Sequence, residues 1–250
     1  MAMRPPLSVV IAARDESRGL PALLADLATA PELVLEVLVV DGGSRDGTPQ
    51  LATLAGARVL HDGSGRGGQL AAGVAHSAGS WLLLLHGDVR LPPGWARAIT
   101  AAIAAGETSA WAFRLRIAGA GPALRLVELA VELRSRWRQL PYGDQGLLLA
   151  RRLHDAAGGV APLPLMEDLE FVQRLRRRAR IGTLAPAMRV NGRRWQRLGV
   201  WQTVLANARL RRAWRRGAPA AQLAERYYGP AAQGAYQKAQ RRCSGSSSQP

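Results

Sequence analysis

The stretch "LLLLHGDVRLPPGW", residues 82–95, sets four consecutive leucines directly before a polar segment and two prolines. A short, continuous apolar run bounded by turn residues is typical of a strand that is buried on both faces. The polar segment His86-Gly87-Asp88 then falls at the carboxyl end of this strand. Taken alone, Asp88 has two interpretations: a cap for a helix that begins at Pro92, or an oxygen ligand for a divalent metal.

The first 90 residues alternate between strand-like and helix-like segments. Strand patterns cover 7–13, 35–41, 57–62 and 80–86, and helical patterns lie between them at 19–30, 48–55 and 67–78. This alternation predicts a doubly wound α/β fold with a Rossmann-like, mostly parallel sheet. Ligands of such sheets bind at the carboxyl ends of the strands, which is where the polar clusters of this chain occur: 14–16, 41–48 and 86–88.

The rest of the chain is less regular. We expect a helix from Pro93 to about residue 105, a strand at 109–117, a helix at 122–139, a turn and strand within 143–152, and helices at 166–178 and 199–216. From these patterns we expect one α/β domain over residues 1–198. A C-terminal helical extension over 199–243 either packs on this domain or faces a membrane, and a disordered tail covers 244–250.

The chain is strongly basic, with 34 Lys and Arg against 18 Asp and Glu and a formal net charge of +16. Such a charge first suggests nucleic acid as a partner. However, Lys238 is the only lysine, and the excess of arginine and alanine is typical of a GC-rich genome rather than of a selected binding face. We therefore expect no specific nucleic-acid partner, while the basic second half leaves peripheral contact with an anionic membrane as an alternative.

Several features indicate where the protein works. No apolar run approaches the roughly 18–20 residues that cross a bilayer, and the first residues do not resemble a signal peptide. Cys243 is the only cysteine, which excludes a disulfide within the chain and fits a reducing compartment. We expect a cytoplasmic protein, either free or at the inner face of the membrane.

Two stretches have both a structural and a chemical interpretation. In "DGGSRDGT" (41–48), Ser44, Asp46 and Thr48 are candidate caps for the next helix, or the backbone N–H groups of the turn face an anion or a ribose. In "MEDLE" (166–170), acids in the first turn complement the helix dipole, or one of them is a general base.

Taken together, the motifs resemble the family 2 glycosyltransferases of the GT-A fold. The resemblance covers roughly residues 6–215 and is carried by "VVIAARDE" (9–16), "VLVVDGGSRDGT" (37–48), "GRGGQLAAGVAHSAGSWLLLLHGDVRLP" (65–92), "GDQG" (143–146) and "MEDLEFVQRLRR" (166–177). The further "GRRWQRLGVWQT" (192–203) is similar to a compact bacterial subgroup often found near radical-SAM/selenodomain-associated genes.

This resemblance implies a nucleotide-diphosphate sugar donor, Mg²⁺ or Mn²⁺, and inversion at the anomeric carbon. It implies Asp168 as the catalytic base and Asp88 as the metal ligand. The residues implied on the donor side are Ala12, Glu16, Asp41, Gly43, Arg66, His86 and Gly87. Sugar or acceptor contacts are implied for Gly143, Asp144, Gln145 and Glu167, and phosphate contacts for Arg193, Arg194 and Trp195.

The chain departs from the broad family at His86, where most members have an aspartate, although the subgroup often shows H-A-D. The longer Q-x-x-R-W motif of processive synthases is absent, which argues against polysaccharide synthesis. The resemblance leaves the hydroxyl acceptor open, and a lipid-like acceptor would suit the arginine-rich C-terminal helix.

Two other functions are alternatives to this one. A sugar-phosphate nucleotidyltransferase would normally carry a glycine-rich, lysine-containing loop after the first strand, where this chain has "AARDES" (12–17). A non-enzymatic basic protein would bind nucleic acid or anionic surfaces with strong salt dependence and would not bind a nucleotide sugar.

Overall fold

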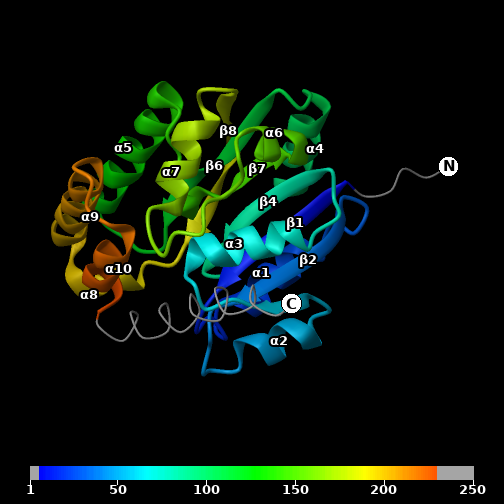
Figure 1. Ribbon diagram of the computed structural model, residues 1–250, viewed down its shortest axis with the longest axis horizontal. Coiled ribbons are helices and arrows are strands. Elements are labelled where there is room, and N and C mark those ends of the chain that lie inside the picture. The colour runs from blue at the N-terminus through cyan, green and yellow to red at the C-terminus, as the bar shows by residue number, and fades with distance from the viewer. Residues whose placement is uncertain (1–5, 230–250) are drawn as a thin grey trace, which may run out of the picture.

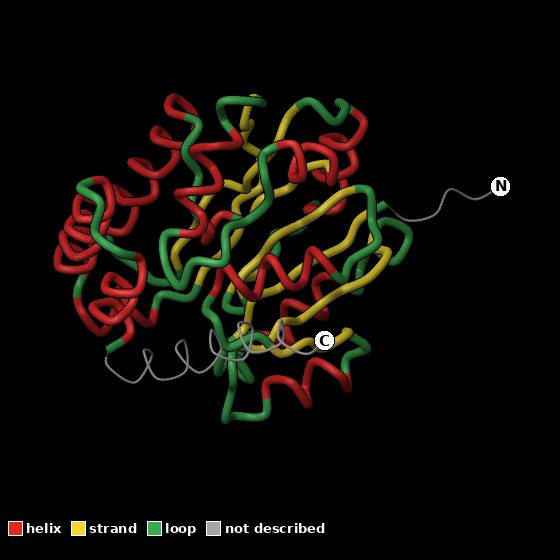
Figure 2. Tube along the Cα trace, in the orientation of Figure 1, coloured by secondary structure: helices red, strands yellow, loops and turns green. Residues whose placement is uncertain are grey.

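The computed structural model describes residues 6–229, and in this range eight strands form one sheet flanked by helices (Figures 1 and 2). The strand order is β3-β2-β1-β4-β7-β6-β8-β5. The strands are β1 (Leu7–Ala13), β2 (Val34–Asp41), β3 (Arg58–His61), β4 (Trp81–His86), β5 (Val89–Arg90), β6 (Ser109–Ile117), β7 (Leu147–Ala150) and β8 (Arg180–Val190). The helices are α1 (Leu20–Leu27), α2 (Thr48–Leu54), α3 (Arg66–Ala75), α4 (Trp95–Ala104), α5 (Pro122–Arg138), the 3₁₀ turn η1 (Gly143–Gln145), α6 (Arg151–Ala156), α7 (Glu167–Leu175), α8 (Arg193–Leu198), α9 (Val200–Arg215) and α10 (Ala220–Tyr228).

Strands β1 to β4 form the parallel, doubly wound half that the apolar runs predict. All seven residues of β1 are buried, as are the leucines of β4, because helices cover both faces of the sheet. Right-handed crossovers put α1 and α2 on one face and α3 on the other, where α3 lies in front of the sheet in Figure 1. The register pairs Ala13 with Asp41 and Ala12 with His86, so all three strands end at one edge.

The second half of the sheet is mixed, with β7 antiparallel to both β4 and β6. Strand β8 was not expected from the sequence, because Gly182 and Pro186 interrupt its pattern and its partner β6 lies far away in the chain. Val89 of the short strand β5 pairs with Val190 of β8, and Asn191 N donates to Asp88 O at 3.2 Å. The segment that carries Asp88 is therefore fixed by β8.

Asp88 does not cap the following helix. Helix α4 begins at Trp95 rather than at Pro92, and Gly94 occupies its N-cap position with a φ of 78°. The prolines lie between β5 and α4, so the acid is separated from the helix by the whole of β5. The capping interpretation of Asp88 is wrong, and its carboxylate is available for another role.

The C-terminal helices pack on the α/β domain. Leu223 and Ala224 of α10 form a buried cluster with Leu165, Met166 and Leu169 at the start of α7. Helices α8 and α10 were not expected as separate elements. Gly199 separates α8 from α9 and Gly217 follows α9, both with positive φ. The remainder of the expected extension, 230–243, and the expected disordered tail, 244–250, lie outside the described residues. Within residues 6–229, none of the helices has the length and hydropathy of a membrane span.

Candidate active site

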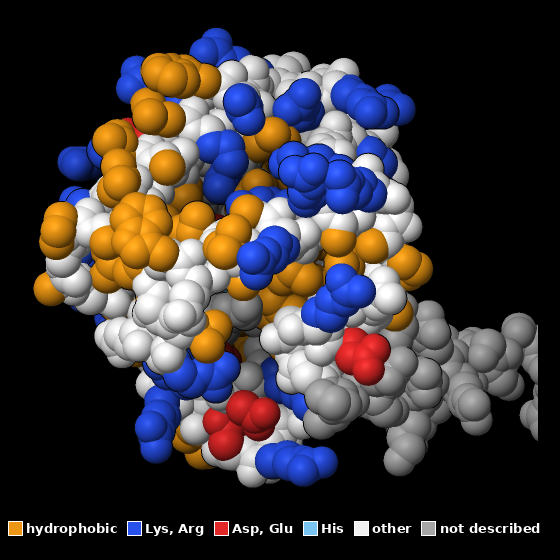
Figure 3. Space-filling model, turned by 90° about the vertical axis from the view of Figure 1, so that its left-hand side faces the viewer, with side chains coloured by type: hydrophobic (Ala, Val, Ile, Leu, Met, Phe, Trp, Pro, Cys, Tyr) orange, Lys and Arg blue, Asp and Glu red, His pale blue; other side chains and the backbone are white. Residues whose placement is uncertain are grey.

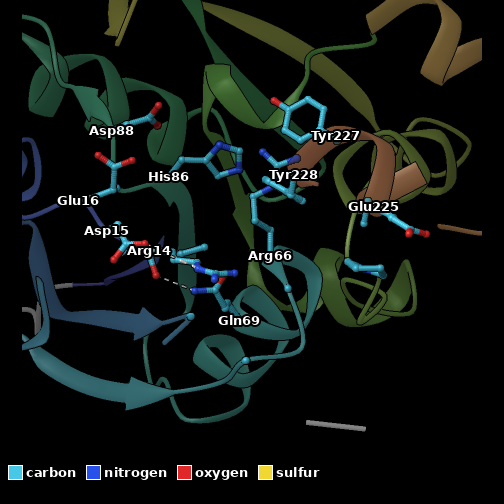
Figure 4. A pocket seen from close by; sticks show the side chains of 18 of the residues that line it. Arg14, Asp15, Glu16, Arg66, Gln69, His86, Asp88, Glu225, Tyr227 and Tyr228 are labelled. Carbon is cyan, nitrogen blue, oxygen red and sulfur yellow. Dashed lines mark hydrogen bonds and ion pairs between the residues drawn. The ribbon is translucent and has the colours of Figure 1, made fainter. Parts of the chain in front are cut away.

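A cavity of about 480 Å³ lies at the carboxyl ends of β1 and β4 (Figure 4). Its walls come from distant parts of the chain, because the loops of the parallel sheet form one side and α10 forms the other. The sheet side includes Ala12, Glu16, Gly42, Arg66, Gln69, His86, Gly87 and Asp88, and the α10 side includes Ala221, Ala224, Glu225, Tyr227 and Tyr228. The structure thus brings together five of the seven predicted donor residues with the predicted metal ligand.

The DGGSRDGT motif holds the loop that carries Glu16. Ser44 Oγ accepts a hydrogen bond from Asp15 N, Thr48 Oγ1 accepts one from Glu16 N, and Asp46 Oδ2 accepts one from Ser17 N, each at 2.9 Å. Gly47 occupies the N-cap position of α2, and Asp46 Oδ1 accepts a hydrogen bond from Thr48 N at 3.1 Å in the first turn of that helix. Asp46 therefore bonds the start of α2, while Ser44, Asp46 and Thr48 together fix the shape of the cavity-lining loop after β1.

Asp41 also has a local role in the turn after β2. Its carboxylate accepts hydrogen bonds from Gly43 N at 2.9 Å and Ser44 N at 3.1 Å, and the residue is 3% exposed. Neither Asp41 nor Gly43 lines the cavity, although Gly42 does. Contact of Asp41 and Gly43 with the nucleotide stays a prediction.

Gln69 is a cavity residue that the sequence reasoning missed. Its buried side-chain amide donates to Ala13 O at 2.9 Å and to Val40 O at 2.7 Å, and so joins the ends of β1 and β2. The "GRGGQ" motif was the available signal, since it placed Gln69 directly after the glycines at the start of α3.

A second cavity, of about 210 Å³, lies beside the first. Arg66, His86, Asp88 and Tyr227 line both cavities. The other residues of the second cavity include Tyr142, Asp144, Met166, Asp168, Asn191, Trp195, Thr203, Asn207, Leu210 and Arg211. Asp168 contributes to the second cavity and not to the first, so the predicted base and the predicted donor pocket lie on opposite sides of a shared boundary.

Asp168 is held in place by the backbone. Gly143 N donates to its Oδ2 at 2.8 Å, and Leu169 N donates to its Oδ1 at 2.7 Å. A Cβ atom on Gly143 would lie 2.7 Å from His86 Cε1 and 3.4 Å from Asp168 Oδ2, so glycine is needed for this close approach. The GDQG motif therefore brings Asp168 and His86 to the same point.

Burial changes the protonation of several groups around this boundary. The pKa of Glu167 is raised to about 7 by burial, against the opposing effect of Arg66. Burial also raises the pKa of Asp144 to about 6, in spite of Arg134 and with the help of Asp168 and Asp88. Burial, reinforced by Asp88, raises the pKa of Glu16 to about 7. These carboxyl groups crowd one region, which is a frequent property of functional sites.

His86 has a buried imidazole ring and lies at the boundary between the two cavities. Burial and the neighbouring Arg66 lower its pKa to about 4, against Asp88 and Asp168, so the ring is neutral at physiological pH. In Figure 4 the ring lies between Asp88 and Glu16 on one side and Arg66 and Tyr227 on the other. Its Nε2 is buried and has no hydrogen-bond partner among the described residues.

The remaining predicted residues lie in different surroundings. Glu167 is 0% exposed, and its Oε1 lies 3.1 Å from Arg66 Nε, so it holds the guanidinium group of Arg66 in position. Gln145 lines neither cavity, since its Nε2 donates to Phe113 O and its Oε1 accepts from Ser135 Oγ. Arg193 Nη2 donates to Glu16 Oε2 at 2.8 Å. The side chain of Arg194 lies outside the described residues. The proposed substrate contacts of these residues stay predictions.

The surroundings of Asp88 are compatible with a divalent metal that has one ligand from the protein. No residue between 6 and 229 donates a hydrogen bond to the Asp88 carboxylate, and the neutral His86 lies next to it. The described residues contain no group of three or more His, Cys, Asp or Glu placed to hold a metal ion. Mg²⁺ usually keeps several waters and binds through one or two carboxylates and substrate phosphates, and Mn²⁺ also favours oxygen ligands. The free carboxylate of Asp88 is compatible with this arrangement, and its role as the metal ligand stays a prediction.

Solved structures confirm the expected GT-A α/β fold. S. aureus TarS 1–349 superposes with a TM-score of 0.60 at 17% identity, over 74% of this chain and 60% of that chain. Glucosyl-3-phosphoglycerate synthase from Mycobacterium tuberculosis, in complex with Mn²⁺, UDP and phosphoglyceric acid, superposes with a TM-score of 0.58 at 22% identity, over 85% and 79% of the two chains. TarS 1–349 is also known in complex with UDP-GlcNAc.

Sequence comparison gives the family. A curated TPR repeat-containing protein of Synechococcus elongatus is 39% identical over 90 residues, which cover 34% of this chain and only 21% of that protein. The family model described as glycosyl transferase family 2 matches residues 8–164. This match includes the first cavity's sheet side and extends over more than half of the chain, so the protein belongs to glycosyl transferase family 2.

Proposed function

We propose that the protein is an inverting glycosyltransferase that moves a sugar from a nucleotide-diphosphate donor to a hydroxyl acceptor. The observation that carries this proposal is the pair of cavities that share Arg66, His86 and Asp88. The first cavity has the residues expected around a donor, and Asp168 lies on the second. A donor in the first cavity and an acceptor in the second would have their reacting atoms at the shared boundary.

The proposed reaction follows from this arrangement. Asp168 accepts the proton of an acceptor hydroxyl, a general-base effect typically worth ~10²–10⁴-fold in rate. The hydroxyl oxygen then attacks the anomeric carbon from the side of the second cavity, while the bond to the diphosphate breaks on the side of the first. Attack opposite to the leaving group inverts the anomeric carbon. Arg66, which lines both cavities, would stabilise the charge that develops on the diphosphate.

We propose Mg²⁺ or Mn²⁺ as the cofactor, held by Asp88 with His86 beside it. When bound, the ion supplies positive charge that neutralises the diphosphate leaving group. The Mn²⁺ and UDP complex of the Mycobacterium tuberculosis synthase supports a divalent ion in this fold. Arg193, which bonds Glu16 at the edge of the first cavity, is proposed as a phosphate contact together with Arg194 and Trp195.

The acceptor group in the second cavity is proposed to be a neutral, hydroxyl-rich moiety. Asp88, Asp144 and Asp168 line this cavity together with Arg66 and Arg211, so acidic side chains outnumber basic ones, and carboxylates accept hydrogen bonds from hydroxyl groups. We place the enzyme in the cytoplasm, at the inner face of the membrane when its acceptor is lipid-linked. A nucleotidyltransferase is less consistent with the site, because no lysine follows β1.

A donor panel with matched variants tests the proposal. Hydrolysis or transfer from uridine and guanosine diphosphate sugars is measured with Mn²⁺ or Mg²⁺ for the wild type, Asp168→Asn and the control Glu170→Gln. Glu170 lies on the same helix but pairs with Arg174. We expect Asp168→Asn to lower turnover ~10²–10⁴-fold with unchanged binding of the nucleoside diphosphate, and Glu170→Gln to keep turnover. Unchanged turnover in Asp168→Asn would refute its role as the base.

A further inference from the structure

Helix α5 exposes an apolar stripe to solvent. Leu126, Leu129 and Trp137 are 54%, 51% and 75% exposed, and their spacing places them on one face of the helix. The opposite face buries Leu124 and Glu128 against the protein. A surface helix normally shows polar residues to water, so an outward apolar stripe indicates a partner.

Helix α9 repeats this arrangement. Trp201 and Leu205 are 62% and 50% exposed on one face, while the opposite face buries Thr203 and directs Leu210 into the second cavity. Helices α5 and α9 both lie on the left side of Figure 1. Figure 3 shows that side from the front, with apolar side chains gathered over these helices and arginine side chains around them.

Unpaired arginines continue this surface. Arg209, Arg212 and Arg216 follow Trp201 and Leu205 on the outer face of α9 and line a shallow hollow together with Gly217 and Ala218. Among residues 6–229, no acidic group forms an ion pair with these three guanidinium groups. Their positive charge therefore faces solvent beside the exposed tryptophan and leucine.

We propose that the outer faces of α5 and α9 dock on an anionic phospholipid bilayer. Tryptophan and leucine side chains insert at the level of the headgroups, and arginines bind the lipid phosphates. The formal net charge of +16 complements such a surface. A second copy of this chain is a poor occupant, because it would bring the same arginines against one another.

The docking does not depend on the proposed function, but it gives that function a location. The inner face of α9 lines the second cavity through Thr203, Asn207, Leu210 and Arg211. A bilayer against the outer face of the same helix would place the acceptor side of the site next to the headgroups. An acceptor anchored in the membrane would then reach Asp168 with a short polar segment.

Vesicle sedimentation with the full chain tests the docking. We expect binding to vesicles of phosphatidylglycerol and phosphatidylcholine, and weak binding to phosphatidylcholine alone. The triple variant Leu129→Ser, Trp137→Ser, Trp201→Ser should lower the partition coefficient at least about tenfold, because each exposed apolar side chain contributes to insertion. Arg212→Gln should lower it about fivefold at low salt.

Two controls and three outcomes make the test decisive. Leu54→Ser on α2, where Leu54 is 84% exposed, and Arg97→Gln on α4 remove equivalent side chains elsewhere and should leave binding unchanged. Melting curves confirm that each variant folds. Equal loss of binding in the controls, absence of binding to anionic vesicles, or a dimer that the triple variant dissociates would each overturn the proposal.

Discussion

The buried carboxyl of Glu167 gives a prediction whose size and sign follow from the structure. Its side chain is 0% exposed, 3.1 Å from Arg66 Nε, and neither carboxylate oxygen has a hydrogen-bond partner among the described residues. Burial raises its pKa from 4.5 to about 7. The folded state therefore holds a proton that the unfolded state releases between about pH 4.5 and pH 7, so Glu167 lowers the stability of the fold as pH rises through this window.

The change Glu167→Gln removes this titration while it keeps the size of the side chain. A shift of this size corresponds to a pH-dependent difference of roughly 2 to 3 kcal/mol between pH 5 and pH 8. At pH 5 the wild-type carboxyl is protonated and resembles the amide. At pH 8 the wild type carries a buried charge that the variant lacks. We expect the free energy of unfolding of Glu167→Gln, relative to wild type, to increase by this amount.

Urea unfolding at pH 5, 6, 7 and 8 measures the effect, with Glu128→Gln as the control. Burial alone would raise the pKa of Glu128, but bonds from Ile117 N, Arg116 and Arg125 hold it below its usual value. Because the pKa of Glu128 is lowered rather than raised, Glu128→Gln should destabilise the protein by a similar amount at all four pH values. If the free energies of unfolding of Glu167→Gln and wild type changed with pH in parallel, Arg66 would fully offset the effect of burial on the pKa of Glu167. That result would refute the reasoning.

Three further predictions test the assembly of the site. Gly67→Ala should destabilise the protein by about 1–3 kcal/mol, since its Cβ would lie 2.4 Å from Ala161 O. A thermal melt of this single variant, in which the neighbouring Gly68 is kept, measures the loss. Gln69→Leu should lower the free energy of unfolding by about 2 kcal/mol and weaken nucleotide binding, because Ala13 O and Val40 O both lose their amide donor. Asp88→Asn should raise the Mn²⁺ concentration required for nucleoside diphosphate binding in a calorimetric titration, and equal metal dependence would contradict the role of Asp88 as ligand.

The position of the first cavity could be predicted from the sequence because its signals are local. The apolar runs of β1 and β4 put the polar segments 14–16 and 86–88 at one edge of a parallel sheet, and Glu16, His86 and Asp88 line one cavity there. Their role in donor binding stays a prediction. The same reasoning missed half of the role of the DGGSRDGT turn. Asp46 bonds Thr48 N at the start of the following helix, but Ser44, Asp46 and Thr48 also bond a loop about thirty residues earlier in the chain.

The other parts of the site depend on contacts between distant segments, which no local pattern records. Tyr227 and Tyr228 reach the first cavity only because α10 packs against Leu165 and Leu169. The position of Asp88 depends on the pairing of Val89 with Val190, and β8 was not recognised in the sequence. Long-range pairing and helix docking therefore limited the prediction, although the residue types in the motifs were informative.

The match to the family model ends at residue 164, just before Asp168. Beyond that residue lie Asp168, the strand that fixes Asp88, and helices α9 and α10. Residues after 164 supply most of the lining of the second cavity, and α10 supplies one wall of the first. The segment recognised by the family model thus supplies the sheet side of the first cavity, and the remaining segment supplies the proposed base and the proposed acceptor wall. We propose that α9 contributes to the choice of acceptor, because Thr203, Asn207, Leu210 and Arg211 line the second cavity and not the first. Exchange of α9 between members of this family should then change the acceptor while it leaves the donor nucleotide unchanged.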